Sequence, residues 1–201
     1  MELRNVLVVD PVDGEYVANV RVSGRKIESV EMSQGSPSGL LIPGFVDVHT
    51  HGAAGVNSMS MEAGDLEKWE RFLYAHGVTF FTPTTVSAGT DEMLRATGIV
   101  SDYIKDRSAT SVKGIHYEGP YINSRKKGAQ NPETIRPSTL DELHEVITDD
   151  VMIVTMAPEV EGFFEALEFL KKRDIVVSMG HTDSSFSLIK HAFEAGCDRM
   201  T

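Results

Sequence analysis

The sequence has a single cysteine, Cys197, among 201 residues, so no disulfide can form within the chain. It also lacks a run of about 18 apolar residues, the length that a membrane-spanning helix requires, and no basic and apolar leader opens it. Lysine and arginine are scarce against aspartate and glutamate, 19 to 30, which leaves a formal net charge of -11. A surface of this sign repels nucleic acid and anionic membranes. These absences predict a cytoplasmic protein that has neither as a partner.

What remains is the composition of an ordinary globular protein, with 41% hydrophobic and 24% charged residues. Residues 1–40 differ in pattern from the rest. A short apolar run at 6–9 is followed by two further runs, 17–22 and 27–30, which flank a serine-glycine turn and predict a hairpin. We therefore expect residues 1–40 to be the N-terminal strands of a small β domain, part of a β-sandwich, that precedes a main domain at 41–201.

In the main domain, apolar strand-like runs alternate with amphipathic helical runs. Strands that are apolar on both faces and separated by helices form a parallel sheet. In the last helical run, Phe186, Ile189 and Phe193 have the spacing of a buried stripe, and a sixth strand is expected to start near Cys197. The five predicted strands cover residues 41–48, 78–82, 112–117, 151–156 and 175–179.

Five strand-helix units in a row are compatible with a (β/α)8 barrel or with a doubly wound sheet. No glycine-rich fingerprint follows the first strand, which argues against a dinucleotide-binding sheet. Polar residues collect instead after the C-terminal ends of several strands, where barrel enzymes carry their catalytic groups. The sequence therefore predicts an α/β fold comprising the first five to six strands of a TIM-like (β/α)8 barrel.

Candidate metal ligands stand at the ends of three of these strands. His49 and His51 end the first strand, and because residues i and i+2 of a strand point to the same side, both imidazoles can face one ion. Glu118 ends the third strand, where an unpaired buried carboxylate would be costly, and His181 follows the fifth. Each residue alone also has a purely structural interpretation, as a salt-bridged or hydrogen-bonded side chain. Together, on one rim of a barrel, they predict a divalent-metal site that activates water.

Several segments resemble a known family. Residues 43–52, Pro-Gly-Phe-Val-Asp-Val-His-Thr-His-Gly, resemble the signature of the amidohydrolase superfamily. Residues 116–120 (His-Tyr-Glu-Gly-Pro), 126–132 (Lys-Lys-Gly-Ala-Gln-Asn-Pro), 135–136 (Ile-Arg) and 180–182 (Gly-His-Thr) are similar to the N-acetylglucosamine-6-phosphate deacetylase family within it. The resemblance extends over essentially the whole chain, and the chain is identified as the N-terminal portion of such an enzyme.

The resemblance implies hydrolysis of the acetamide of N-acetylglucosamine 6-phosphate, giving glucosamine 6-phosphate and acetate in amino-sugar catabolism. It implies a divalent metal, zinc or iron, with one or two ions bound. Glu118 and His181 correspond to ligands of the principal metal. His49 and His51 fall where some members of the family bind a second metal.

The resemblance also assigns substrate contacts. Ala129 and Gln130 fall in the loop that contacts the sugar, and many relatives have histidine where this chain has Gln130. The general-base aspartate of the family is expected beyond Thr201, and Asp183 is a weaker substitute because its position suggests a helix N-cap. Because this base is missing, we expect the 201-residue chain alone to be inactive. We also expect the full-length protein to be a homodimer.

Two other interpretations stay open. The first is a different amidohydrolase, which acts on cyclic amides. Such enzymes commonly bridge two metals with a modified lysine at the end of strand four, whereas residues 155–159 here read Thr-Met-Ala-Pro-Glu, and Glu118 fits the bridging position instead. The second interpretation is a non-catalytic fragment of the deacetylase.

Overall fold

A computed structural model describes residues 1–201. The chain divides into two compact units, Met1–Phe45 and Val46–Thr201, and each is described by itself. None of the helices combines the length and the apolar character that crossing a bilayer requires.

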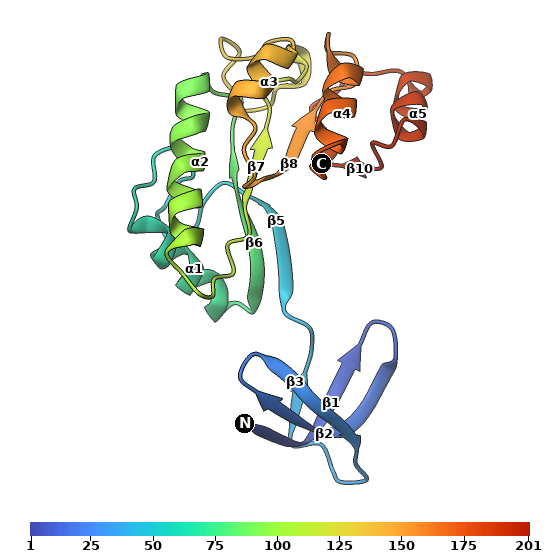
Figure 1. Ribbon diagram of the computed structural model, residues 1–201. Coiled ribbons are helices and arrows are strands. Elements are labelled where there is room, and N and C mark those ends of the chain that lie inside the picture. Colours follow the sequence, from blue (N-terminus) through green and yellow to red (C-terminus); the bar gives the residue numbers. More distant parts are fainter. The chain divides into compact units, whose positions relative to one another are not determined.

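The first unit is a four-stranded sheet with the strand order β3-β2-β1-β4 (Figure 1). β2 pairs antiparallel with both β1 and β3, which confirms the predicted hairpin, whereas β4 joins β1 in parallel. Alternate residues of a strand point to one face, and on that face Val6, Val8, Ala18 and Val20 are buried together. The strands are β1 Glu2–Asp10, β2 Gly14–Ser23, β3 Lys26–Met32 and β4 Gly39–Leu41.

The predicted strand at residues 41–48 is wrong as a single element. Leu41 ends β4 in the first unit, and a new strand, β5, begins at Phe45. The break falls at Pro43-Gly44, because proline has no N–H to donate to a sheet and glycine has a high conformational freedom. The division between the two compact units falls at the start of β5.

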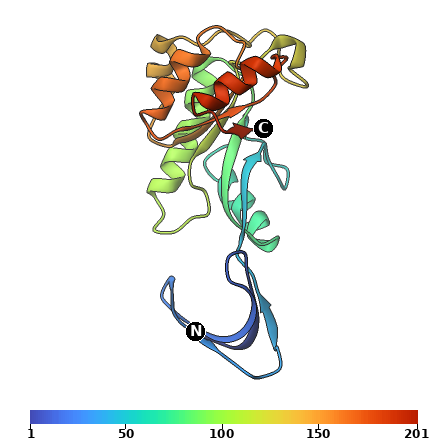
Figure 2. The ribbon, with the colours of Figure 1, turned by 90° about the vertical axis from the view of Figure 1, so that its right-hand side faces the viewer.

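The second unit is a six-stranded sheet in the order β10-β9-β8-β7-β6-β5, with helices between the strands (Figures 1 and 2). Neighbouring strands from β6 to β10 pair in parallel, as the apolar runs predicted. The strands are β5 Phe45–Thr50, β6 Val78–Thr85, β7 Ile115–Glu118, β8 Val151–Met156, β9 Val176–Met179 and β10 Arg199–Met200. The helices are α1 Asp65–Ala75, α2 Thr90–Lys105, the 3-10 helix η1 Ser124–Lys126, α3 Leu140–Val146, α4 Phe163–Lys171 and α5 Phe186–Glu194.

This sheet is strongly curled. A cavity of about 340 Å³ is lined by side chains from every one of its strands, among them Val48, Phe80, Ile153, Val176 and Met200. A flat sheet could not bring side chains from all of its strands around one cavity. Because parallel strands end at the same edge, the curl also gathers the residues that follow β5, β7 and β9 on one rim.

Apolar side chains are exposed at both ends of the curled sheet. In the predicted buried stripe of the last helix, Ile189 is partly buried against the core, but the prediction is wrong for Phe186 and Phe193, which are 83% and 58% exposed. At the other end, Phe45 and Val46 of the edge strand β5 are 58% and 63% exposed. Within the second unit, no strand pairs with the outer edge of β5 or of β10.

A buried carboxylate connects helices α1 and α2 with the segment before β7. Glu70 accepts hydrogen bonds from the Tyr103 hydroxyl at 2.6 Å, the Thr110 hydroxyl at 2.6 Å, and both the hydroxyl (2.9 Å) and the N–H of Ser111. Burial raises the pKa of Glu70, but the hydrogen bonds outweigh it and the net pKa is lowered. The charged form therefore stabilises the fold.

Replacing Glu70 by glutamine is expected to lower the free energy of unfolding by about 1–3 kcal/mol at pH 7, because the neutral amide keeps one acceptor oxygen and the donors lose their hydrogen bonds to a charged group. A lowered pKa in the folded state means that the stabilisation is present above the ordinary glutamate pKa and is lost as the pH falls through the folded value. The difference between wild type and Glu70→Gln should therefore shrink below about pH 4. Urea denaturation measures it, with Glu67→Gln on the exposed side of α1 as the control. Equal losses in the two variants at pH 7 would contradict the assignment.

Candidate functional site

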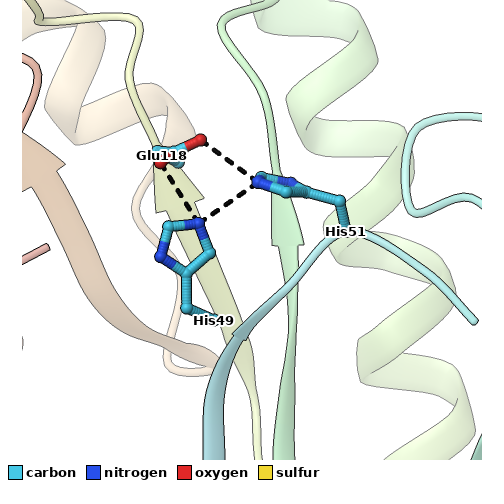
Figure 3. A group of neighbouring side chains, drawn as sticks. All are labelled: His49, His51 and Glu118. Carbon is cyan, nitrogen blue, oxygen red and sulfur yellow. Dashed lines mark hydrogen bonds and ion pairs between the residues drawn. The ribbon is translucent and has the colours of Figure 1, made fainter.

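Two imidazoles project from the end of β5. His49 and His51 lie on the same side of the strand, as their i, i+2 spacing predicted, and their Nε2 atoms are 3.2 Å apart (Figure 3). The turn that follows is tight: a Cβ at Gly52 would lie 2.0 Å from the carbonyl oxygen of Val56. His51 Nδ1 lies 3.0 Å from the carbonyl oxygen of Thr84, on the neighbouring strand β6. This contact fixes the orientation of the ring.

The carboxylate of Glu118 lies opposite both imidazoles. Glu118 is the last residue of β7 and is only 5% exposed. Its Oε1 is 3.1 Å from His49 Nε2, and its Oε2 is 3.2 Å from His51 Nε2 (Figure 3). The curl of the sheet makes this meeting possible, because β6 lies between β5 and β7 in the strand order.

His181 joins the same carboxylate from a third strand end. It lies two residues beyond β9, and its Nε2 is 3.0 Å from Glu118 Oε1. Its Nδ1 is 2.8 Å from the carbonyl oxygen of Lys126. The backbone of His181 is in the left-handed region, with φ of +49°, which is uncommon for a residue other than glycine. The structure thus brings together all four predicted metal-site residues.

The protonation pattern of the cluster favours a bound cation. A carbonyl oxygen only accepts hydrogen bonds, so His51 and His181 each donate from Nδ1, and a ring that carries no second proton presents a lone pair at Nε2. Both lone pairs face oxygens of Glu118, which also only accept. Acceptors at this distance repel unless a cation or an added proton lies between them.

The pKa shifts of His51 and Glu118 also indicate that this cluster favours a positive charge beside the carboxylate. The hydrogen bond with Glu118 raises the pKa of His51. Burial raises the pKa of Glu118, but the contacts with His49, His51 and His181 outweigh it and hold that pKa well below its usual range. Glu118 is therefore a carboxylate at neutral pH.

The spacing of the ligand atoms also fits a metal. His49, His51 and Glu118 offer ligand atoms that all lie within 4.8 Å of one another. Two nitrogen ligands at ordinary zinc distances are about 3.3 Å apart in a tetrahedral site, and the two Nε2 atoms are 3.2 Å apart. Imidazole and carboxylate are ligands that zinc and iron both accept. The cluster has the donor set and the spacing of a divalent-metal site.

His116, which also points into the curl, has a different environment. Its Nδ1 lies 2.8 Å from the carbonyl oxygen of Val48, and its Nε2 lies 2.8 Å from the Thr155 hydroxyl. Burial lowers the pKa of His116 to about 4, so the ring is neutral at pH 7. Both nitrogens are used by the protein, and the ring braces β5 against β7 and β8.

The predicted sugar-contacting residues lie in the loop after η1. The side-chain amide of Gln130 donates to Glu118 Oε2 at 2.6 Å and accepts from the N–H of Ser87, and Gln130 is 5% exposed. Ala129 precedes it and is exposed. The contact between Gln130 and Glu118 was not predicted from the sequence, because the two residues are separated by a loop whose path no local pattern determines.

Asp183 does not have the capping position that the sequence suggested. Ser185 is the N-cap of α5 and accepts from the N–H of Leu188. Asp183 instead pairs with Arg125 at 2.6 Å and with Lys126 at 3.2 Å. Sequence reasoning also missed Glu159, although it follows the end of β8 and so carried the same strand-end signal as Glu118.

Comparison with known proteins finds relatives that are named as deacetylases of N-acetylated amino-sugar phosphates. No family model matches the chain. It is 31% identical over 175 residues to the N-acetylglucosamine-6-phosphate deacetylase of Bacillus subtilis, covering 84% of this chain and 44% of the relative. It is 33% identical over 165 residues to an N-acetylgalactosamine-6-phosphate deacetylase of Escherichia coli O157:H7, covering 80% and 44%.

The structural comparison agrees. The crystal structure of the N-acetylglucosamine-6-phosphate deacetylase of Thermotoga maritima superposes with a TM-score of 0.94 at 42% identity, over 100% of this chain and 54% of that one. The chain thus spans about half the length of the proteins that it matches. In sequence and in fold it matches the N-terminal portion of the N-acetylglucosamine-6-phosphate deacetylases, as its motifs predicted.

Proposed function

We propose that this chain is the N-terminal part of a metal-dependent deacetylase that hydrolyses the acetamide of N-acetylglucosamine 6-phosphate to glucosamine 6-phosphate and acetate. One observation carries the proposal. The ends of β5 and β9 direct three imidazole nitrogens at the buried carboxylate of Glu118, the last residue of β7, in a chain that is 42% identical to the Thermotoga maritima enzyme.

In this proposal Glu118 and His181 hold the principal metal, zinc or iron, and His49 and His51 complete its site or hold a second ion. A divalent cation there supplies Lewis acidity, which lowers the pKa of water and polarises an amide carbonyl. The two oxygens of Glu118 face different partners, His49 and His181 at Oε1 and His51 at Oε2. This division of contacts is compatible with one ion or with two.

The remaining roles in the reaction fall to the substrate loop and to residues outside the chain. Two of the hydrogen-bonding positions of the Gln130 amide are used by Glu118 and Ser87. We assign its second N–H and the exposed Ala129 to the sugar, since an amide nitrogen carries two hydrogens. The general base is an aspartate beyond Thr201, which takes a proton from water and returns it to the leaving amine.

The same proposal extends to the whole protein. The curled sheet, from β5 to β10, forms the first part of a (β/α)8 barrel, and the strands β1 to β4 form part of a β-sandwich. We further propose a cytoplasmic homodimer. The exposed apolar residues at both ends of the curled sheet support the barrel, because further strands and helices would bury them.

A second candidate substrate is N-acetylgalactosamine 6-phosphate, which differs from the glucosamine sugar in its configuration at C4. One relative, 33% identical, is named as a deacetylase of that sugar.

The cyclic-amide alternative has less support. No lysine follows β8, and the carboxylate of Glu118 already lies between the histidines.

The test measures acetate release from N-acetyl sugars and ring opening of a cyclic amide by the whole protein with added zinc. Four substrates are compared at equal concentration: the two 6-phosphorylated N-acetyl sugars, unphosphorylated N-acetylglucosamine, and a cyclic amide such as hydantoin. We expect the highest kcat/KM for N-acetylglucosamine 6-phosphate. Faster turnover of the galactosamine epimer would reassign the substrate, and opening of the cyclic amide without deacetylation would overturn the proposal.

A further inference from the structure

A second carboxylate, Glu159, lies at the centre of the loops that follow β7, β8 and β9. Its Oε1 accepts from the side-chain N–H of Asn123 at 2.8 Å and from the N–H of Asp183 at 2.6 Å. Its Oε2 accepts from the hydroxyl of Thr182 at 2.6 Å and from the hydroxyl of Ser184. One side chain thus holds three consecutive residues of the loop after β9.

The carboxylate of Glu159 is ionised when it accepts these hydrogen bonds from the loop. Burial raises the pKa of Glu159, but the hydrogen bonds from Ser184, Thr182 and the N–H of Asp183 outweigh it and lower the pKa to about 2. All four contacts come from neutral donors, and hydrogen bonds to a charged acceptor are stronger than those between neutral groups.

The residue immediately before the held segment is His181. Its left-handed backbone is unfavourable for a residue with a Cβ, so the surrounding structure has to maintain it. Asn123 takes part from the other side: its N–H donates to the carbonyl oxygen of His181 at 3.0 Å, while its side chain donates to Glu159. Glu159 and Asn123 therefore enclose the His181 peptide from two loops.

We propose that Glu159 is a positioning residue that holds His181 in the conformation in which Nε2 faces Glu118. Glu159 does not contact the ring of His181 and acts through residues 182–184 and Asn123. The inference rests on the proposed function only in taking His181 as a metal ligand. Its geometric part, the orientation of His181, can be tested without metal.

Two substitutions separate geometry from charge. Glu159→Ala leaves the N–H of Asp183 and the amide of Asn123 without an acceptor. Glu159→Gln can keep the network, because its oxygen can accept from those two N–H groups while its NH2 donates to the hydroxyls of Thr182 and Ser184. Glu161→Ala is the matched control, an exposed glutamate two residues further along the same loop.

The experiment uses the whole protein, labelled with 13C at histidine Cε1, and reads the ring signals without metal before zinc is titrated. We expect Glu159→Ala to shift the His181 signal, which is assigned with His181→Gln, and to weaken zinc binding about 10- to 100-fold. Glu159→Gln and Glu161→Ala should stay within about threefold of wild type. If Glu159→Ala fails to fold, Thr182→Val removes one of the four donors and should shift the same signal by less.

An unchanged His181 signal with unchanged zinc affinity in Glu159→Ala would overturn the inference. A lower melting temperature in that case would make Glu159 a purely structural residue. If the wild type binds no zinc, the proposed function fails, while a shifted His181 signal would still support the positioning role.

Discussion

Replacing Glu118 by glutamine is expected to remove the bound metal and to lower kcat/KM for N-acetylglucosamine 6-phosphate by on the order of 100-fold or more. The carboxylate contacts all three candidate histidine ligands within 3.2 Å. An amide keeps one acceptor oxygen and turns the other position into a donor, without the negative charge that neutralises a cation. His49→Asn should cost less metal, because His49 meets only one oxygen of that carboxylate.

Elemental analysis of the whole protein, purified in the presence of zinc, measures the occupancy, and acetate release measures turnover. Glu145→Gln, at an exposed position of α3, is the control and should retain both. Full and equal metal content in wild type and Glu118→Gln would remove Glu118 from the metal site. A loss of metal in His49→Asn that exceeds the loss in Glu118→Gln would reverse the proposed order of the ligands.

The 201-residue chain alone is expected to release no acetate, even with zinc present. Catalysis requires a base within hydrogen-bond reach of the attacking water, and the only aspartate that the sequence offered for this role, Asp183, is held by Arg125 and Lys126. The curled sheet also has two open edges, at β5 and β10. Unpaired strand edges and exposed apolar side chains favour association between molecules.

The measurement is an acetate assay of the purified chain, combined with sedimentation to detect association. We expect self-association and no turnover, and we expect activity to return when the remaining strands of the proposed barrel are supplied as a second polypeptide. Sustained turnover by a monomeric chain, abolished by Glu118→Gln, would show that the chain contains its own base.

Local patterns predicted most of the architecture. The alternation of apolar and helical runs yields the parallel order of the strands, because a strand buried on both faces needs a helix to return to the same edge. The break in the predicted strand at Pro43, between β4 and β5, was not predicted. The strand appears continuous from residue 41 in hydrophobicity alone, and the break depends on the missing N–H of proline and on where β4 finds its partner.

The sequence by itself determined which chemical groups reach the rim of the curled sheet. Side chains alternate along a strand, so the spacing of His49 and His51 was enough to put both imidazoles on one side. The same reasoning placed Glu118 and His181 at strand ends. Side-chain alternation and position at a strand end are short-range properties of the backbone, so both can be predicted directly from the sequence.

Only the tertiary structure decided how those groups meet. The distances to Glu118, the hold of Gln130 on its second oxygen and the network around Glu159 all join residues that are 12 or more positions apart. Their geometry depends on the curl of the sheet and on the paths of three loops, and no local spacing encodes either. The exposure of Phe186 and Phe193 also depends on tertiary structure, because a side chain is buried only if another element packs against it. An amphipathic pattern shows only that a side chain is suited to burial.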